Sequence, residues 1–163
     1  MKNKKVLFLT QAAMIAALYI VLTYFINAFN LASGAIQVRI SEALTILPVF
    51  TPAAIPGLFV GCLLSNSLTG CMPLDILFGS LATLIGAFGT RALRKHQWLA
   101  PLPPILANTI IVPFILSYVY HFEGSLLYFA VTVGIGEILS CGVLGMILYF
   151  ALQKQANRIF QTL

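Results

Sequence analysis

The stretch VLFLTQAAMIAALYIVLTYFINAF, residues 6–29, decides the class of this protein. It runs for 24 residues without a charged side chain, and about 20 predominantly apolar residues are enough to span a bilayer as an α-helix. The apolar core of a signal peptide is shorter, about 7–15 residues, so we expect this run to be a retained first transmembrane helix. Lys2, Lys4 and Lys5 precede it, which places the N-terminus in the cytoplasm under the positive-inside rule.

The composition of the whole chain points the same way. Of its 163 residues, 60% are hydrophobic and only 8% are charged, whereas a soluble globular domain carries about 25% charged residues. The net charge of +5 would indicate nucleic-acid binding in a soluble protein. Here the basic residues gather between apolar runs and indicate membrane topology instead. The composition therefore excludes a soluble domain, a disordered segment and a nucleic-acid-binding module.

The apolar runs predict an all-α integral membrane protein, a compact bundle of six transmembrane helices that forms a single domain over residues 1–163. Pro48, Pro52 and Pro56 cluster where the second and third helices must be separated, because proline disfavours helix interiors. These two helices are short, so one of them could instead be re-entrant or strongly broken. The expected spans are residues 6–29, 40–50, 53–67, 73–91, 102–120 and 126–152.

The basic clusters test this assignment. With the N-terminus inside, four spans return Arg91, Arg94 and Lys95 to the cytoplasm, and two more return Lys154 and Arg158. All basic clusters then share one side, as the positive-inside rule requires, and both termini are cytoplasmic. The outer side holds three connections, residues 30–39, 66–73 and 120–125.

Two acids stand out because a charge at membrane depth is costly and tends to mark a ligand, a partner or a water-filled cavity. Glu137 follows Ser125 by twelve residues, which is about 18 Å if the sixth helix starts there. Asp75 lies about a turn inside the outer face, since the fifteen residues between it and Arg91 give only about 22 Å of helix. A hydrogen bond to a neighbouring helix would also explain Glu137, and a helix N-terminal position would explain Asp75.

Four further polar residues join them as candidate substrate-binding residues. Arg39 and Glu42 are three residues apart, so they either pair with each other or line an outward-facing site. Asn66 lies near a turn, where asparagine is common for local reasons, and Asn108 lies inside a helix, where bonding between helices would also explain it. The lining is net negative, which suits a cationic or donor-rich ligand, and equally a cation or proton pathway.

Small residues four apart form seams along which helices approach closely. Such a seam either packs inside the chain or docks onto another membrane subunit, and both interpretations stay open here. The pairs are Ala12 with Ala16, Ala13 with Ala17, and Gly57 with Gly61.

Several catalytic motifs are missing from the sequence. It has no P-loop, no HExxH and no GxSxG motif, and Cys62, Cys71 and Cys141 have no metal-type spacing, so we expect them to be free thiols. We therefore expect no enzyme activity, no metal and no cofactor in this chain. Energy for active transport would come from a gradient or from partner ATPases.

Three stretches carry a resemblance to a known family: VRISEALT at 38–45, FTPAAIPGL at 50–58 and DILFGSLATL at 75–84. They closely resemble the QueT family, whose members are substrate-binding S components of energy-coupling factor (ECF) transporters assigned to queuosine precursors. The resemblance covers essentially the whole chain.

The resemblance implies a multi-pass protein of the bacterial cell membrane that captures queuine or a 7-deazaguanine base at the outer face. It also implies a membrane coupling subunit and two cytoplasmic ATPases that use the ATP. In such families an alanine-rich seam on the first helix meets the coupling subunit, which would assign that interface to Ala12, Ala13, Ala16 and Ala17.

The base itself suits a polar lining of this kind. A carboxylate can accept the ring N–H and the exocyclic amine of a 7-deazaguanine together, and a cationic arm would need a second carboxylate. The sequence does not assign these jobs among Glu137, Asp75 and Glu42, nor does it say whether Arg39 or an asparagine serves the carbonyl. Phe78, Phe114 or Tyr118 could stack on the base, but aromatic residues in membrane spans more often serve plain packing. The competing function is a stand-alone secondary transporter or cation pathway that uses Glu137 and Asp75.

Overall fold

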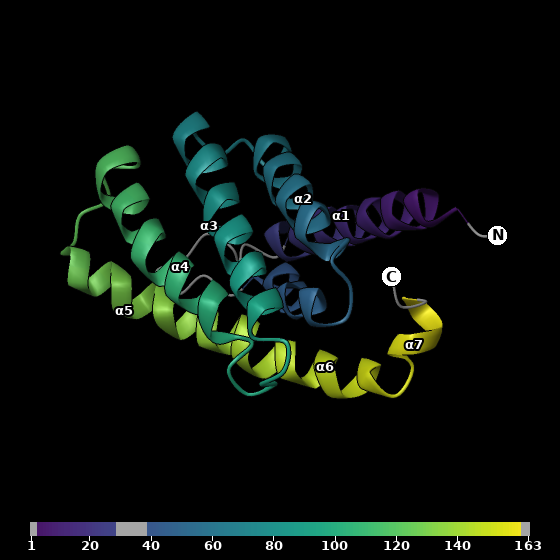
Figure 1. Ribbon diagram of the computed structural model, residues 1–163. Helices are drawn as coiled ribbons and strands as arrows, with labels where there is room; N and C mark the ends of the chain where they lie inside the picture. The colour runs from purple at the N-terminus through teal and green to yellow at the C-terminus, as the bar shows by residue number, and fades with distance from the viewer. Residues whose placement is uncertain (1–2, 29–38, 161–163) are drawn as a thin grey trace.

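The computed structural model describes residues 3–28 and 39–160, and within them every assigned element is helical. The expected loop at residues 30–39 lies outside the described residues except for Arg39. The elements are α1 (Lys4–Ala28), the 3₁₀ helix η1 (Ile40–Val49), α2 (Ala54–Leu68), α3 (Pro73–Ala92), α4 (Leu102–Phe114) with its π-helical extension η2 (Ile115–Val119), α5 (Leu126–Glu137), the π-helix η3 (Ile138–Leu144), α6 (Gly145–Gln153) and α7 (Ala156–Ile159) (Figure 1).

The expectation of an all-helical chain is confirmed for the described residues. Each predicted span begins and ends within two residues of a helical stretch. Two of these stretches, η1 and α2, are short apolar helices. Four are long and apolar enough to cross a membrane: Lys4–Ala28, Pro73–Ala92, Leu102–Val119 and Leu126–Gln153.

The short helix η1 lies in the interior of the bundle. Residues 41–48 are all buried, and η1 packs against α1, α3, α6 and η3. Its ten residues make it long for a 3₁₀ helix, which usually runs for about 3–4 residues. The Arg91 guanidinium donates to the carbonyl oxygens of Pro48 and Val49, at 3.0 and 3.2 Å, and so satisfies acceptors that the end of η1 would leave open.

The GxxxG pair packs inside the chain, where α2 crosses α1. A Cβ added at Gly57 would lie 2.7 Å from the carbonyl oxygen of Ala12, and one at Gly61 would lie 2.8 Å from the Cβ of Tyr19. Ala16 is buried and faces Gly61. Glycine is therefore required at both positions because the two backbones approach closely.

The four alanines of α1 consequently divide into two faces. Ala12 and Ala16 face α2 inside the chain, so their small size serves internal packing, and a contact of these two with a partner subunit stays a prediction. Ala13 and Ala17 lie on the exposed face of α1. Only this second pair is open to another membrane protein.

Prolines and glycines pair in the contact between α3 and α4. A Cβ at Gly86 would lie 2.7 Å from the Cα of Pro104, and a Cβ at Gly89 would lie 2.4 Å from the Cβ of Pro103. The proline rings that open α4 therefore fill the space that the two glycines leave. This close contact holds α4 against α3.

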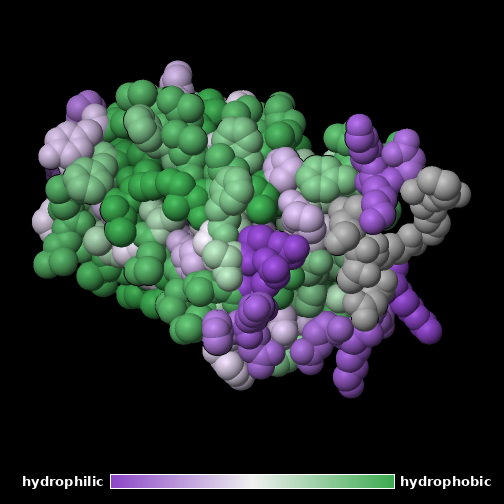
Figure 2. All heavy atoms as spheres, in the orientation of Figure 1, coloured by the Kyte–Doolittle hydropathy of each residue, from purple (hydrophilic) through white to green (hydrophobic). Residues whose placement is uncertain are grey.

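The basic clusters share one end of the molecule. The Gln11 side chain of α1 donates to the carbonyl oxygen of Phe160 at 2.7 Å and accepts from the hydroxyl of Thr51 at 2.7 Å. The ring of Phe50, after η1, stacks on Phe160 with centroids 5.9 Å apart. The start of α1, the end of η1 and the region after α6 therefore meet, and Figure 2 shows hydrophilic side chains gathered toward this end of an otherwise largely hydrophobic face.

Candidate functional site

A cavity of about 210 Å³ lies toward the other end of the bundle. It is much larger than the about 10–15 Å³ that one water molecule needs. Asn27 and Thr69 line it from the C-terminal ends of α1 and α2, and Asp75 lines it from the N-terminal end of α3. The basic clusters lie at the opposite ends of α1 and α3, so the cavity and the basic clusters occupy opposite ends of the bundle, and Arg39 is the basic residue that lines the cavity.

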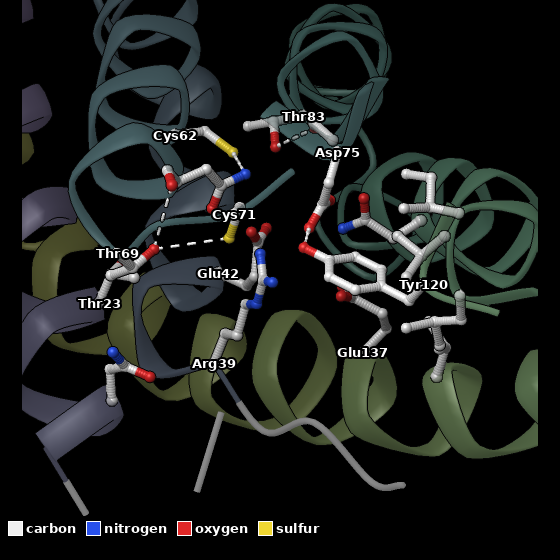
Figure 3. A pocket seen from close by; sticks show the side chains of 18 of the residues that line it. Thr23, Arg39, Glu42, Cys62, Thr69, Cys71, Asp75, Thr83, Tyr120 and Glu137 are labelled. Carbon is white, nitrogen blue, oxygen red and sulfur yellow. Dashed lines mark hydrogen bonds between the residues drawn. The ribbon is translucent and has the colours of Figure 1, made fainter. Parts of the chain in front are cut away.

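All six candidate residues predicted from the sequence line this one cavity. They come from five stretches of chain that are far apart in sequence, so only the folded bundle brings them together (Figure 3). The depths predicted for Asp75 and Glu137 assumed that one helix begins before Asp75 and another near Ser125. Both helix starts are confirmed, since α3 begins at Pro73 and Ser125 caps α5 through a hydrogen bond from the Tyr128 amide. Their role in binding a ligand stays a prediction. The six are Arg39, Glu42, Asn66, Asp75, Asn108 and Glu137.

The deep part of the cavity is acidic. Glu42 and Glu137 are only 2% and 7% exposed. One carboxylate oxygen of Glu42, Oε1, accepts a hydrogen bond from the Tyr19 hydroxyl. The other oxygen, Oε2, is buried and has no hydrogen-bond partner. The Cys141 thiol donates to Oε2 of Glu137 at 3.2 Å.

These deep side chains form a cluster that the sequence did not reveal. The ligand-type atoms of Glu42, Glu137 and Cys141 all lie within 4.8 Å of one another, so this cluster could hold a cation. Glu137 ends α5 and Cys141 lies in the π-helix η3 that follows, while Glu42 comes from η1. Glu42 lies far from Glu137 and Cys141 in the sequence, so no metal-binding motif of fixed spacing joins all three residues. π-Helical turns of this kind occur often at functional sites.

The mouth of the cavity combines an acid with aromatic rings. The Tyr120 hydroxyl donates to Asp75 at 2.8 Å and accepts from the Met72 amide at 3.2 Å. The Tyr120 ring stacks on Phe122, with centroids 5.7 Å apart. Burial raises the pKa of the Tyr120 phenol, so the phenol stays a hydrogen-bond donor to Asp75. Figure 3 shows Asp75 and Tyr120 pointing toward each other at the cavity.

Gly79 keeps space open between two polar groups at the mouth. A Cβ at this position would lie 3.3 Å from the amide nitrogen of Asn66 and 3.3 Å from Oδ1 of Asp75. A donor and an acceptor therefore both border the space that a side chain at position 79 would enter. Such a pair can bind the edge of a heterocycle that presents the complementary groups.

The sequence matches the family model described as QueT transporter over residues 9–154. This chain belongs to the QueT transporter family. A curated relative from Lactococcus lactis subsp. cremoris (strain MG1363), named queuosine precursor transporter QueT, is 34% identical over 85 residues, which cover 52% of this chain and 50% of the relative. The aligned part thus spans about half the length of that relative. No solved structure gives a significant match.

The QueT match covers every residue that lines the cavity. Together with the four helices that can span a membrane, it makes the chain a multi-pass membrane protein of the QueT transporter family. The relative is bacterial, in agreement with the expected bacterial origin.

The aromatic residues of this QueT protein differ from the sequence prediction. Phe78, Phe114 and Tyr118 are 45%, 51% and 65% exposed and do not line the cavity, so of the two alternatives the structure contradicts stacking on a ligand in this cavity. Tyr120 and Phe122 line it instead. Tyr120 and Phe122 follow the end of η2, where the chain is no longer helical. Helical periodicity therefore does not predict which way their side chains point.

Proposed function

We propose that this QueT-family protein is the substrate-binding S component of an ECF-type importer and captures a queuosine precursor, queuine or another 7-deazaguanine base. One observation carries the proposal: Glu42 holds an unpartnered carboxylate oxygen in a buried cavity that two further acids line. An acceptor buried without a partner costs about 1–3 kcal/mol. A ligand rich in N–H donors would recover that free energy, and the name of the relative supports this class of ligand.

The mouth of the cavity suits the base. A carboxylate accepts two neighbouring N–H groups well, and Asp75 retains Oδ1 beside the Asn66 amide. The stacked Tyr120 and Phe122 offer a flat apolar surface of the kind on which heterocycles pack.

We also propose six membrane-crossing segments with both termini in the cytoplasm. Arg39, before η1, lines the cavity, whereas Phe50, just after η1, stacks on Phe160 at the basic end. The helix η1 therefore runs from one end of the bundle to the other, and α2 returns to the cavity at Asn66. The positive-inside rule assigns the basic end to the cytoplasm, so the cavity faces outward.

Transport itself then needs partner subunits. The sequence has no P-loop, so we propose that ATP is used by two cytoplasmic ATPases linked through a membrane coupling subunit. The exposed small residues Ala13 and Ala17 are our candidate docking face for the coupling subunit, since small residues allow helices to approach closely.

A gradient-driven transporter is the second candidate function. The cluster of Glu42, Glu137 and Cys141 within 4.8 Å favours it, because paired acids at membrane depth also occur in proton and cation pathways. Vesicles that contain only this chain separate the two functions. Uptake driven by an ion gradient would support the second candidate, and uptake that appears only with the partner subunits and ATP would support the first.

The first prediction concerns ligand binding to the purified chain. In detergent, calorimetry is expected to show tight binding of queuine, of its aminomethyl-deazaguanine precursor or of its cyano-deazaguanine precursor. Guanine and thiamine serve as controls and are expected to bind much more weakly. Failure of all three bases to bind a folded protein would contradict the proposed substrate class.

The second prediction concerns Gly79. A methyl group there would crowd the Asn66 amide and the Asp75 carboxylate, so Gly79→Ala is expected to weaken binding by about tenfold, or about 1.4 kcal/mol. Gly142→Ala is the matched control, because a Cβ at Gly142 would lie 3.8 Å from side-chain atoms of Ile105 and Ile138, which is ordinary van der Waals contact. Unchanged affinity in Gly79→Ala would show that the ligand does not use this part of the mouth.

A further inference from the structure

We propose that Glu42 and Glu137 together bind a positively charged amine of the ligand, and that the heterocyclic ring lies nearer the mouth against Tyr120 and Phe122. The inference rests on the proposed function and deepens it, because it assigns the two ends of the ligand to the two ends of the cavity. The ligand class that fits this arrangement is a deazaguanine base with an alkylammonium arm.

The spacing of the two acids is the first argument. Carboxylate oxygens of Glu42 and Glu137 lie within 4.8 Å of each other in the interior of the bundle. Two carboxylates this close disfavour each other's charge when they are buried. A cation between them relieves that repulsion, whereas the neutral edge of a base does not.

The open acceptor is the second argument. Oε2 of Glu42 has no hydrogen-bond partner although Glu42 is 2% exposed and lines the cavity. The donor nearby, Cys141, is already directed at Glu137. An ammonium group carries several N–H donors on one atom, so it can serve both carboxylates at once.

The charge balance is the third argument. Among the described lining residues, three acids face a single basic side chain. Arg39 can offset one of the three carboxylates, and Figure 3 shows its side chain extending toward the centre of the cavity. Two carboxylates stay without a basic partner, and a cationic ligand supplies one positive charge to them, which lowers the cost of burying unpaired charge.

The mouth offers a contrasting environment. Asp75 already accepts from the Tyr120 hydroxyl at 2.8 Å, and its other oxygen and the Asn66 amide nitrogen both border the space next to Gly79. This acceptor and donor match the edge of a ring, and the stacked Tyr120 and Phe122 match its face. The ring therefore belongs at the mouth and the amine belongs deeper.

The test compares two bases that differ in the arm: the aminomethyl base, which is cationic, and the cyano base, which is neutral. Calorimetry measures both against wild type and against Glu42→Gln, Glu137→Gln and Asp75→Asn. In Glu42→Gln the glutamine keeps an oxygen that can accept from the Tyr19 hydroxyl, so we expect this variant to keep the fold. Glu123→Gln is the matched control, since Glu123 is exposed in the turn before α5.

We expect Glu42→Gln and Glu137→Gln each to weaken binding of the aminomethyl base by about 10–100-fold, because a charge-assisted hydrogen bond is lost. The affinity for the cyano base should fall by less than about threefold in the same variants. So small a loss of affinity does not indicate a lost charge-assisted hydrogen bond. Asp75→Asn should weaken both bases by a similar factor, and Glu123→Gln should affect neither.

Equal losses for the two bases in the Glu42 and Glu137 variants would overturn the inference and leave the proposed function standing. Tighter binding of the cyano base to wild type would overturn it as well. Failure of wild type to bind either base or queuine would overturn the proposed function, and the inference with it. Comparing two ligands on one variant separates a local effect on the amine from a general loss of structure, which would weaken both bases alike.

Discussion

Under the proposed S-component function, Ala13→Leu is expected to abolish uptake of the queuosine precursor while binding to the purified chain stays unchanged. Ala13 is exposed on α1, on the face that does not pack against α2. A leucine there would hold a partner helix away from the close approach that small residues allow, but it would not touch the cavity. Uptake is measured in cells that contain the coupling subunit and both ATPases, and binding is measured by calorimetry.

Two further variants separate an effect on partner docking from an effect of added bulk or of lost stability. Ala151→Leu places the same bulk on another exposed position, in α6, and is expected to transport normally. Ala16→Leu should instead lower thermal stability, because Ala16 is buried against Gly61 of α2. Normal uptake by Ala13→Leu would show that this face of α1 does not meet the coupling subunit.

Gly61→Ala is expected to destabilise the bundle by about 1–3 kcal/mol, the usual cost of overpacking. The added Cβ would lie 2.8 Å from the Cβ of Tyr19 and 3.1 Å from the backbone of Ala16, and backbone atoms cannot move aside locally. Because the Tyr19 hydroxyl donates to Glu42, a shift of α1 also disturbs the acidic cluster. Thermal unfolding in detergent should show a lower melting temperature, and calorimetry should show weaker binding.

Gly134→Ala is the control for this prediction. A Cβ at Gly134 would meet Thr109 atoms at 3.4 and 3.5 Å, which is ordinary van der Waals contact, so stability should stay close to wild type. A melting temperature for Gly61→Ala equal to that of Gly134→Ala would contradict the close contact between α1 and α2.

Several features of the fold could be read from the sequence because their causes are local. The apolar runs and the prolines around them predicted the bounds of the helical stretches between Lys4 and Gln153 to within two residues, but they did not predict the short helix α7. Hydropathy and proline stereochemistry act on a short segment whatever its neighbours are. The 3₁₀ geometry of η1 was not predicted, because it depends on how the surrounding helices bury residues 41–48.

The candidate site shows the same division. Glu137, Asp75 and Glu42 could be identified from the sequence because a charge at membrane depth is costly in any fold and needs a specific reason to be there. The aromatic residues could not be identified in this way, since an aromatic side chain is stable both against lipid and in a binding site. Tyr120 lines the cavity whereas Tyr118 faces outward, and only the rotation of the helix and the turn after it separate the two.

The sequence by itself therefore determined that the chain is a helical membrane protein, where its helices lie, and which polar residues are out of place in lipid. The tertiary structure alone decided that Glu42, Glu137 and Cys141 meet within 4.8 Å and that Ala16 faces inward while Ala13 faces outward. The reason is physical: hydropathy depends on each segment separately, whereas distances between side chains depend on how η1, α5 and η3 pack around one another.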